Sequence, residues 1–165
     1  MLSIARHTDY AARLVLHLAA VGDNEQVSIR EVAEARLLPM PFVRRLVGRL
    51  IEANILSSVR GAGGGIRLAR PAAEISLLDI VEAMEGGVAL NRCVHDPQGC
   101  PLAGRCPIQC VWSAVNRQIT ESLSAVRFDA LARTSPEHLS VHLKLHTSAV
   151  KRPVRRKSPL RLSAP

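Results

Sequence analysis

Aromatic side chains are scarce in this 165-residue sequence, which contains only Tyr10, Phe42, Trp112 and Phe128. Binding of single-stranded nucleic acid by base stacking needs aromatic platforms, so this class of protein is disfavoured. No apolar run approaches the roughly 20 residues that span a membrane. The apolar N-terminal stretch carries charged residues and so does not resemble a secretory signal. We therefore expect a cytoplasmic protein without a membrane partner.

Acidic residues are absent from segment 151–165, which holds six of the 22 basic residues, so the net charge of +8 is unevenly distributed. The first 150 residues carry the remaining 16 basic residues against 14 acidic ones. Within them, segment 36–73 contains seven arginines and only one acid, Glu52. Such a patch suits a polyanion, of which duplex DNA is the commonest, although a basic balance can also serve solubility alone.

Three helices are expected in the first third of the chain, because apolar residues recur there with helical spacing. The first covers about 4–21 and ends at Gly22. A short second helix follows Ser28, whose hydroxyl and Glu31 form a capping-box pattern. The third runs from about Pro41 to Asn54 with one continuous apolar stripe. Two helices joined by a tight turn predict either a helix-turn-helix or an ordinary helical hairpin with a solvated basic face.

A glycine-rich β-hairpin, which we call the wing, is expected directly after the third helix. Residues 55–59 are β-prone, residues 60–65 are rich in glycine, and residues 66–68 alternate as a strand does. The glycines do not form a nucleotide-binding loop, since neither Lys-Ser/Thr nor a helix follows them. A wing favours the DNA-binding interpretation, in which the third helix enters the major groove and the wing reaches phosphate or the minor groove. The candidate DNA-binding residues are Ser28, Pro41, Phe42, Arg44, Arg45, Arg49, Arg60, Gly63 and Arg67.

Taken as a whole, the sequence predicts a mainly α fold with a small β-wing. It consists of a winged helix-turn-helix domain followed by a long dimerisation helix. We divide the chain into a DNA-binding domain at 1–85, a cysteine loop at 86–106, a dimerisation helix region at 107–133 and a basic, disordered tail at 134–165. Ser76 is a candidate cap for a fourth helix in the first region. A lone amphipathic helix after a DNA-binding domain favours a homodimer on a palindromic site. The tail could add DNA affinity or be a passive, solvated segment.

All four cysteines lie between Cys93 and Cys110, which in a reducing compartment indicates a metal or redox site before a disulfide framework. Six residues separate Cys93 from Cys100, five separate Cys100 from Cys106, and three separate Cys106 from Cys110. Thiolates in a Pro/Gly-rich loop suit an iron–sulfur cluster, and zinc stays open although the usual Cys-x2-Cys pair is missing. Cys110 is either a fourth ligand or a buried structural thiol, and His95 is close in sequence.

Several motifs together resemble the IscR/NsrR/RirA family of winged-helix regulators. They are Thr8-Asp9-Tyr10-Ala11, Ile29-Arg30-Glu31-Val32-Ala33, the string from Val59 to Pro71 that contains the wing glycines, and the three spaced cysteines. The resemblance covers about 1–132. It implies a homodimer that regulates promoters and holds a cluster near the dimer interface.

The resemblance also bears on the cluster ligands. IscR-like members place a ligating His three residues after the third cysteine, where this chain has Gln109, so an IscR-type 2Fe–2S site does not match. NsrR-like members complete a 4Fe–4S site with an Asp on the first helix of the other subunit, and Asp9 occupies that position. The six-residue gap is longer than in typical IscR or NsrR loops, as in RirA-like loops. We expect a 4Fe–4S cluster bound by Cys93, Cys100 and Cys106. As the fourth ligand, Asp9 of the other subunit is favoured over Cys110. The alternative is that Asp9 only provides a negative charge that is favourable near the start of its helix.

The expected function is thus a DNA-binding repressor whose promoter affinity follows a cluster that senses nitric oxide, iron or redox state. The rival is a zinc- or thiol-based redox regulator without a cluster. An enzyme is not expected, because no nucleophile–base arrangement can be defended, and neither is a small-molecule substrate.

Overall fold

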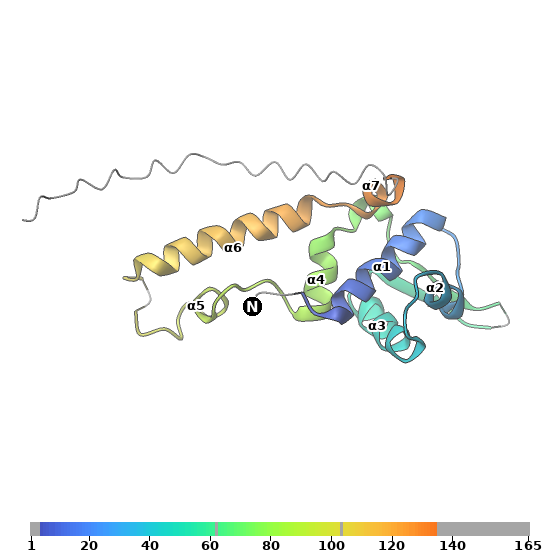
Figure 1. Cartoon of the computed structure of the whole chain (residues 1–165), viewed down its shortest axis with the longest axis horizontal. Coiled ribbons are helices and arrows are strands. Elements are labelled where there is room, and N and C mark those ends of the chain that lie inside the picture. Colours follow the sequence, from blue (N-terminus) through green and yellow to red (C-terminus); the bar gives the residue numbers. More distant parts are fainter. Residues whose placement is uncertain (1–3, 62, 103, 135–165) are drawn as a thin grey trace, which may run out of the picture.

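The computed structural model describes residues 4–61, 63–102 and 104–134, so segment 135–165, where the basic tail was expected, lies outside the described residues. The chain is mainly helical with one antiparallel two-stranded wing, which confirms the expected fold class (Figure 1). In chain order the elements are α1 (Arg6–Val21), α2 (Ile29–Ala35), α3 (Met40–Glu52), β1 (Leu56–Val59), β2 (Gly65–Leu68), a 3-10 turn η1 (Ala72–Glu74), α4 (Leu77–Glu85), α5 (Arg92–His95), α6 (Pro107–Ala125) and α7 (Phe128–Arg133).

Helix α1 lies at the centre of the folded domain and contacts α2, α3, α4, α7 and β2. Its buried side chains Ala11, Leu14, Val15 and Leu18 follow the helical period that the sequence predicted. Helix α3 turns an equivalent stripe inward, formed by Val43, Leu46, Val47 and Leu50. Burial of these two stripes against each other leaves the polar face of α3 in solvent.

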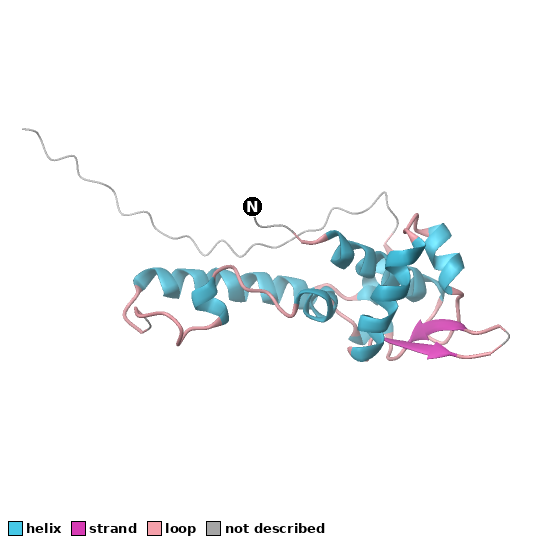
Figure 2. Cartoon of the chain, turned by 90° about the horizontal axis from the view of Figure 1, so that it is seen from below, coloured by secondary structure: helices cyan, strands magenta, loops and turns pink. Residues whose placement is uncertain are grey.

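The wing pairs β1 with β2 in the register Leu56↔Leu68 and Val59↔Gly65. A single bridge adds Val27 to the other edge of β2: the Val27 amide donates to the Ile66 carbonyl at 3.0 Å, and the Ile66 amide donates to the Val27 carbonyl at 2.9 Å. Figure 2 shows the two strands projecting at one end of the molecule. The base of the wing is thereby fixed to the loop before α2.

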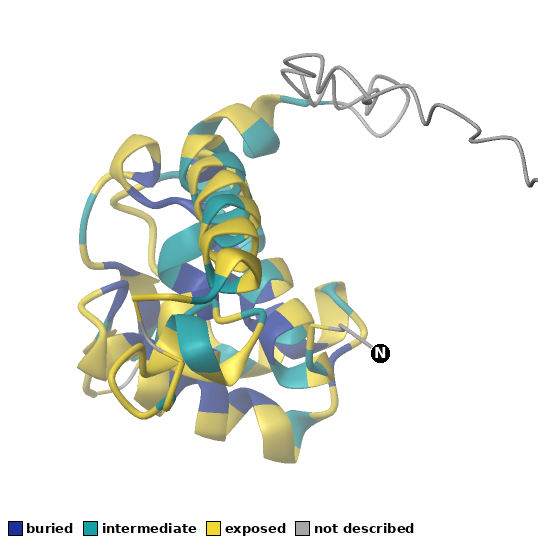
Figure 3. Ribbon diagram, turned by 90° about the vertical axis from the view of Figure 1, so that its left-hand side faces the viewer, coloured by how far each residue is buried: buried dark blue, intermediate teal, exposed yellow. Residues whose placement is uncertain are grey.

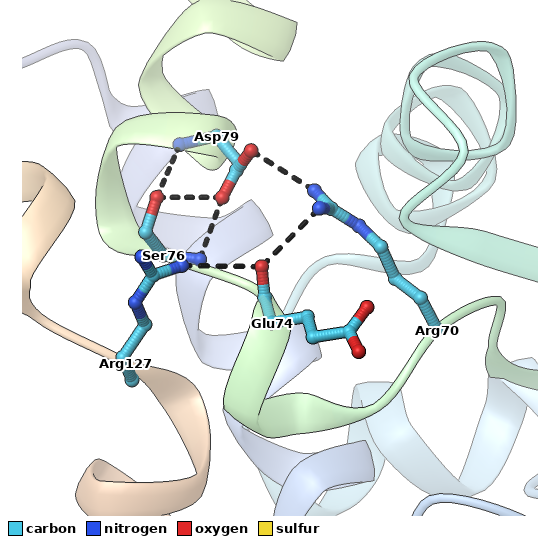
Figure 4. Close-up of polar contacts among 5 residues, drawn as sticks. All are labelled: Arg70, Glu74, Ser76, Asp79 and Arg127. Atoms are coloured by element: carbon cyan, nitrogen blue, oxygen red, sulfur yellow. Dashed lines mark hydrogen bonds and ion pairs between the residues drawn. The ribbon is translucent and has the colours of Figure 1, made fainter.

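A polar junction joins the end of the wing to α4 (Figure 4). Ser76 and Asp79 form a complete capping box at the start of α4, as the sequence suggested for Ser76. Arg70 donates to Asp79 Oδ1 at 2.9 Å, and both Arg70 and Arg127 donate to the Glu74 carbonyl at 3.2 Å. Because Arg127 lies between α6 and α7, the junction binds the returning chain to the domain.

Helix α7 packs back onto α1 rather than continuing α6. The Leu77 amide donates to the Val126 carbonyl at 2.9 Å, the Phe128 amide donates to the Ile75 carbonyl at 3.0 Å, and the Phe128 ring is only 1% exposed. Sequence analysis grouped 107–133 as one dimerisation region, whereas the structure divides it at residues 126–127. Phe128 is therefore a core residue of the domain built around α1.

Helix α6 stands away from this domain, and none of its described residues is buried (Figures 1 and 3). The cysteine loop folds back along it, with α5 contacting α6. The tip of that loop and the wing lie at opposite ends of the molecule. Among the described residues, none of the helices combines the length and apolar content needed to cross a bilayer.

Candidate DNA interface and cysteine loop

The turn between α2 and α3 gives the helix-turn-helix its shape. Leu37 adopts a left-handed backbone with φ of 52° and is 91% exposed, while Leu38 is buried and its amide donates to the Ala33 carbonyl at 2.8 Å. Ser28 caps α2, since its hydroxyl accepts from the Glu31 amide at 3.1 Å, which is one half of the capping box that the sequence predicted. The turn thus leaves the start of α3 open to solvent.

The exposed start of α3 contains four of the candidate DNA-binding residues, namely Pro41, Phe42, Arg44 and Arg45. Neither Arg44 nor Arg45 forms an ion pair within the residues that the structure describes. The Phe42 ring meets the Tyr10 ring of α1 edge-on, with centroids 6.4 Å apart. The contact of Phe42 with Tyr10 holds the start of α3 against α1. The guanidinium groups of Arg44 and Arg45 beside it are suited to contact phosphates and base edges of DNA.

Arg49 is exposed like the other arginines of α3 but differs from them because its side chain binds the backbone of another helix. Its Nη1 donates to the Met84 carbonyl at the end of α4 at 2.8 Å. His7 Nε2 lies 3.3 Å from the same carbonyl, and Glu85 accepts hydrogen bonds from the Thr8 hydroxyl and the Ala5 amide. The Thr8 hydrogen bond is the main cause that holds the pKa of Glu85 below its usual value. Arg49 therefore links α3 to the junction of α1 and α4.

The wing presents Arg60 and Arg67 to solvent, with Arg67 Nε donating to Ser57 Oγ across the strands at 3.3 Å. Gly63 at the tip has a φ of 87°, which favours glycine, and its carbonyl accepts a hydrogen bond from Gln26. A Cβ at Gly65 would overlap the Val27 carbonyl, so this glycine is needed for the close approach at the base. Gln26 could not be predicted as a support of the wing, because it lies outside the hairpin in the sequence.

Cys93, Cys100 and Cys106 are partly buried and unpaired, at the first turn of α5, in the following loop and at the N-cap of α6. No group of three or more His, Cys, Asp or Glu side chains among the described residues is placed to hold a metal ion. The three thiols suit a thiophilic group by their chemistry, but the structure does not bring their sulfurs together, so they must converge to bind one. His95 is exposed next to Cys93.

The two fourth-ligand candidates lie in different places. Cys110 is exposed on α6, so it is not a buried structural thiol in this chain. Asp9 is exposed on the first turn of α1, where its Oδ2 pairs with Arg13 Nη2 at 2.8 Å. Because the cysteines lie along α6, Asp9 is not brought together with them in the single described chain.

Two amide side chains of α6 bind the cysteine loop. Gln109 Nε2 donates to the Cys93 carbonyl at 3.3 Å. Asn116 donates to the Val88 carbonyl and accepts from the Leu90 amide, both at 3.0 Å. From the sequence, Gln109 was predicted only to replace a ligand and Asn116 was not predicted to have a role, because a single polar residue on a helix gives no pattern.

Comparison with known proteins agrees with this architecture. The family described as "Rrf2: Iron-dependent Transcriptional regulator" matches residues 4–134. Protein aau3 of Rhizobium meliloti (strain 1021) is 32% identical over 81% of this chain and 87% of its own length. The HTH-type transcriptional regulator NsrR of Oceanobacillus iheyensis is 31% identical over 61% of this chain and 74% of its own length.

Solved structures at higher than 25% identity share the fold, including those of an IscR and a CymR protein. The IscR of T. potens is 26% identical, with a TM-score of 0.65 over 84% of this chain and 93% of that one. The oxidized form of Staphylococcus aureus CymR is 28% identical, with a TM-score of 0.63 over 81% of this chain and 98% of that one. The winged fold and these matches together show that the chain belongs to the Rrf2 family of helix-turn-helix transcriptional regulators and is not an enzyme.

Proposed function

We propose that this regulator is a cytoplasmic homodimeric repressor that binds a palindromic promoter site in duplex DNA under the control of an iron–sulfur cluster. The observation that carries the proposal is the pairing of an exposed basic α3 and wing with three unpaired cysteines on a loop bound to α6. The DNA contacts are Ser28, Pro41, Phe42, Arg44, Arg45, Arg49, Arg60, Gly63 and Arg67, and Arg49 also binds the Met84 carbonyl.

Dimerisation is assigned to α6. Its large apolar side chains Ile108, Val111, Trp112 and Val115 are between 37% and 59% exposed. They recur at helical spacing, so they form one stripe that a second copy of the helix would cover. A twofold dimer would present two copies of α3 to the two halves of a palindromic site.

The cluster is assigned to Cys93, Cys100 and Cys106, with Asp9 of the partner subunit as the fourth ligand and Cys110 as the alternative. Gln109 binds a backbone carbonyl, which agrees with a 4Fe–4S site of NsrR-like or RirA-like type rather than a 2Fe–2S site ligated at that position. Such a cluster supplies a centre that changes charge and ligation with nitric oxide, iron supply or oxidation. Asp9 must leave or share its ion pair with Arg13 to act as a ligand.

A path from the loop to the DNA-binding surface runs through α4. The loop begins at Gly86 and Gly87, directly after the Met84 carbonyl that Arg49 binds. Convergence of the cysteines would displace this root, and α4 contacts both α6 and α3. Displacement of α4 would therefore reorient α3 and change operator affinity.

Anaerobic purification tests the proposal. We expect a brown protein that contains iron and sulfide, and a colourless Cys100→Ala protein whose DNA binding no longer responds to nitric oxide, chelator or oxygen. Asp9→Ala should destabilise the cluster, while Cys110→Ala should retain it. A Cys100→Ala protein with a normal cluster and response would refute the assignment.

A thiol- or zinc-based redox regulator is the second candidate. It is favoured by the similar CymR structure that was solved in an oxidized form, and by the exposed thiol of Cys110. Colourless wild-type protein that contains zinc, or that forms a disulfide with peroxide and then changes its DNA affinity, would establish this alternative.

A further inference from the structure

The segment that leads into the cysteine loop has little structure of its own. Gly86 and Gly87 both adopt positive φ, 82° and 130°, and no helix or strand forms between α4 and α5. A chain of this kind can swing about its glycines unless another element holds it. In this structure the side chain of Asn116 holds the segment against α6.

Asn116 binds the backbone on both sides of Ala89. Its Nδ2 donates to the Val88 carbonyl and its Oδ1 accepts from the Leu90 amide, each at 3.0 Å. The carboxamide group has a donor and an acceptor at one end, so it can bind an extended segment as a neighbouring strand would. Both hydrogen bonds are partly buried, which limits competition from water.

Gln109 makes the second attachment, two helical turns before Asn116 on α6. Its hydrogen bond to the Cys93 carbonyl fixes the backbone of a candidate ligand. Cys106 is the N-cap of the same helix. The two amides therefore set where the backbone of Cys93 lies relative to that of Cys106.

We propose that Asn116 and Gln109 are positioning residues that hold the cysteine loop against α6, so that Cys93 and Cys106 stay in reach of one shared cofactor. The cofactor part of this inference rests on the proposed function. The attachment itself concerns the protein alone. Loss of the amides should let the loop swing away from α6, and the cofactor should then be released faster.

The test uses the full-length protein with Asn116→Ala and Gln109→Ala. Gln118→Ala is the matched control, because Gln118 is an exposed amide on α6 without a side-chain hydrogen bond in the described part of the chain. Amide hydrogen exchange of cofactor-free protein should show about tenfold faster exchange at Leu90 in Asn116→Ala only. Asn116→Asp retains the acceptor for the Leu90 amide but loses the donor to Val88, so its exchange rate should be intermediate.

Cofactor retention is the second measurement, followed anaerobically by absorbance after addition of a chelator. Each alanine variant should lose its cluster about tenfold faster than wild type and the Gln118→Ala control. Normal Leu90 exchange in Asn116→Ala, or unchanged cluster lifetimes in both variants, would overturn the proposal. A wild-type protein without iron and sulfide would instead refute the proposed cofactor and with it this role, while the exchange data would still decide whether the amides attach the loop.

Discussion

Arginine side chains in the basic segment 36–73 serve two different purposes. Arg44 and Arg45 are exposed at the start of α3, while Arg49, four residues after Arg45, donates to the carbonyl of Met84. All three are exposed and carry the same charge, but within the described residues only Arg49 has a side-chain hydrogen bond to another helix. This difference can be measured as a separation of stability from DNA affinity.

Arg49→Ala should lower the free energy of unfolding by about 1 kcal/mol, because it leaves the Met84 carbonyl without that donor. Arg45→Ala should change stability by less than about 0.5 kcal/mol, yet weaken DNA binding and reduce the slope of log affinity against log salt by about one. Urea unfolding and DNA titration at several salt concentrations check both. Equal stability of the two variants would contradict the assignment.

Asp79 gives the junction of Figure 4 a dependence on pH. Burial raises the pKa of this carboxyl, but hydrogen bonds from Ser76 and Arg70 outweigh burial and hold the pKa below its usual value. A depressed folded-state pKa stabilises the protein above the unfolded-state pKa, and that stability is lost as pH falls through the folded-state value. Asp79 should therefore stabilise the fold at neutral pH and cease to do so in acid.

Asp79→Asn should cost about 1 kcal/mol near pH 7, since it removes the charge that Arg70 pairs with. The difference between the variant and wild type should stay constant down to about pH 5 and shrink below about pH 4. Urea unfolding across this range is the measurement. A difference independent of pH would show that the charge of Asp79 does not contribute.

At the scale of elements, the wing depends on close backbone contact with the loop before α2. Val27 pairs with Ile66, and Gln26 binds the Gly63 carbonyl at the tip. Because Gly65 faces the Val27 carbonyl without space for a Cβ, the wing can keep this position only with glycine there. The position of Arg60 and Arg67 follows from this contact.

Gly65→Ala should destabilise the protein by about 1–3 kcal/mol and weaken DNA binding, because the wing must separate from Val27. Gly48→Ala is the control with the opposite expected sign. Gly48 lies in α3 with open space around its Cβ position, so alanine should stabilise the helix by about 0.5–1 kcal/mol. Thermal unfolding of both variants decides the matter, and a Gly65→Ala protein as stable as wild type would contradict the contact.

At the scale of the whole molecule, α6 projects from the domain with its apolar stripe uncovered (Figures 1 and 3). Within the described residues this helix is attached by Gln109 and Asn116, which bind the cysteine loop and its approach, and by the Arg127 junction after its end, and none of these contacts covers the stripe. We therefore expect a second copy of the chain to pack against this apolar stripe.

Trp112→Glu should weaken dimerisation by roughly 10- to 100-fold, since it replaces about 2 kcal/mol of apolar burial with a charge. DNA affinity should fall with it, because a monomer meets only half of the site. Arg117→Ala, at an exposed position outside the stripe, should leave the dimer intact. Light scattering at several protein concentrations measures this, and an unchanged Trp112→Glu dimer would place the interface elsewhere.

The longer helices, the wing and the cysteine loop could be predicted from the sequence because neighbouring residues encode them, whereas the short α5 within that loop was not predicted. The stripe of α3, the cap at Ser76 and the glycines of the wing each act over a few residues, and their spacing is visible in the chain. Helix bounds accordingly fell within about two residues of those expected, as for α1 at 6–21.

Tertiary structure alone decided which distant residues meet. Arg49 binds a carbonyl 35 residues away, Asn116 binds backbone 26 and 28 residues away, and Phe128 fills a core built mainly from the first 84 residues. No local period signals such pairs, because each depends on the path of the whole chain and involves a single polar or aromatic side chain. Candidate residues for contacts to DNA and to thiophilic groups could therefore be named from the sequence, whereas the contacts that connect these two regions arise only when the chain folds.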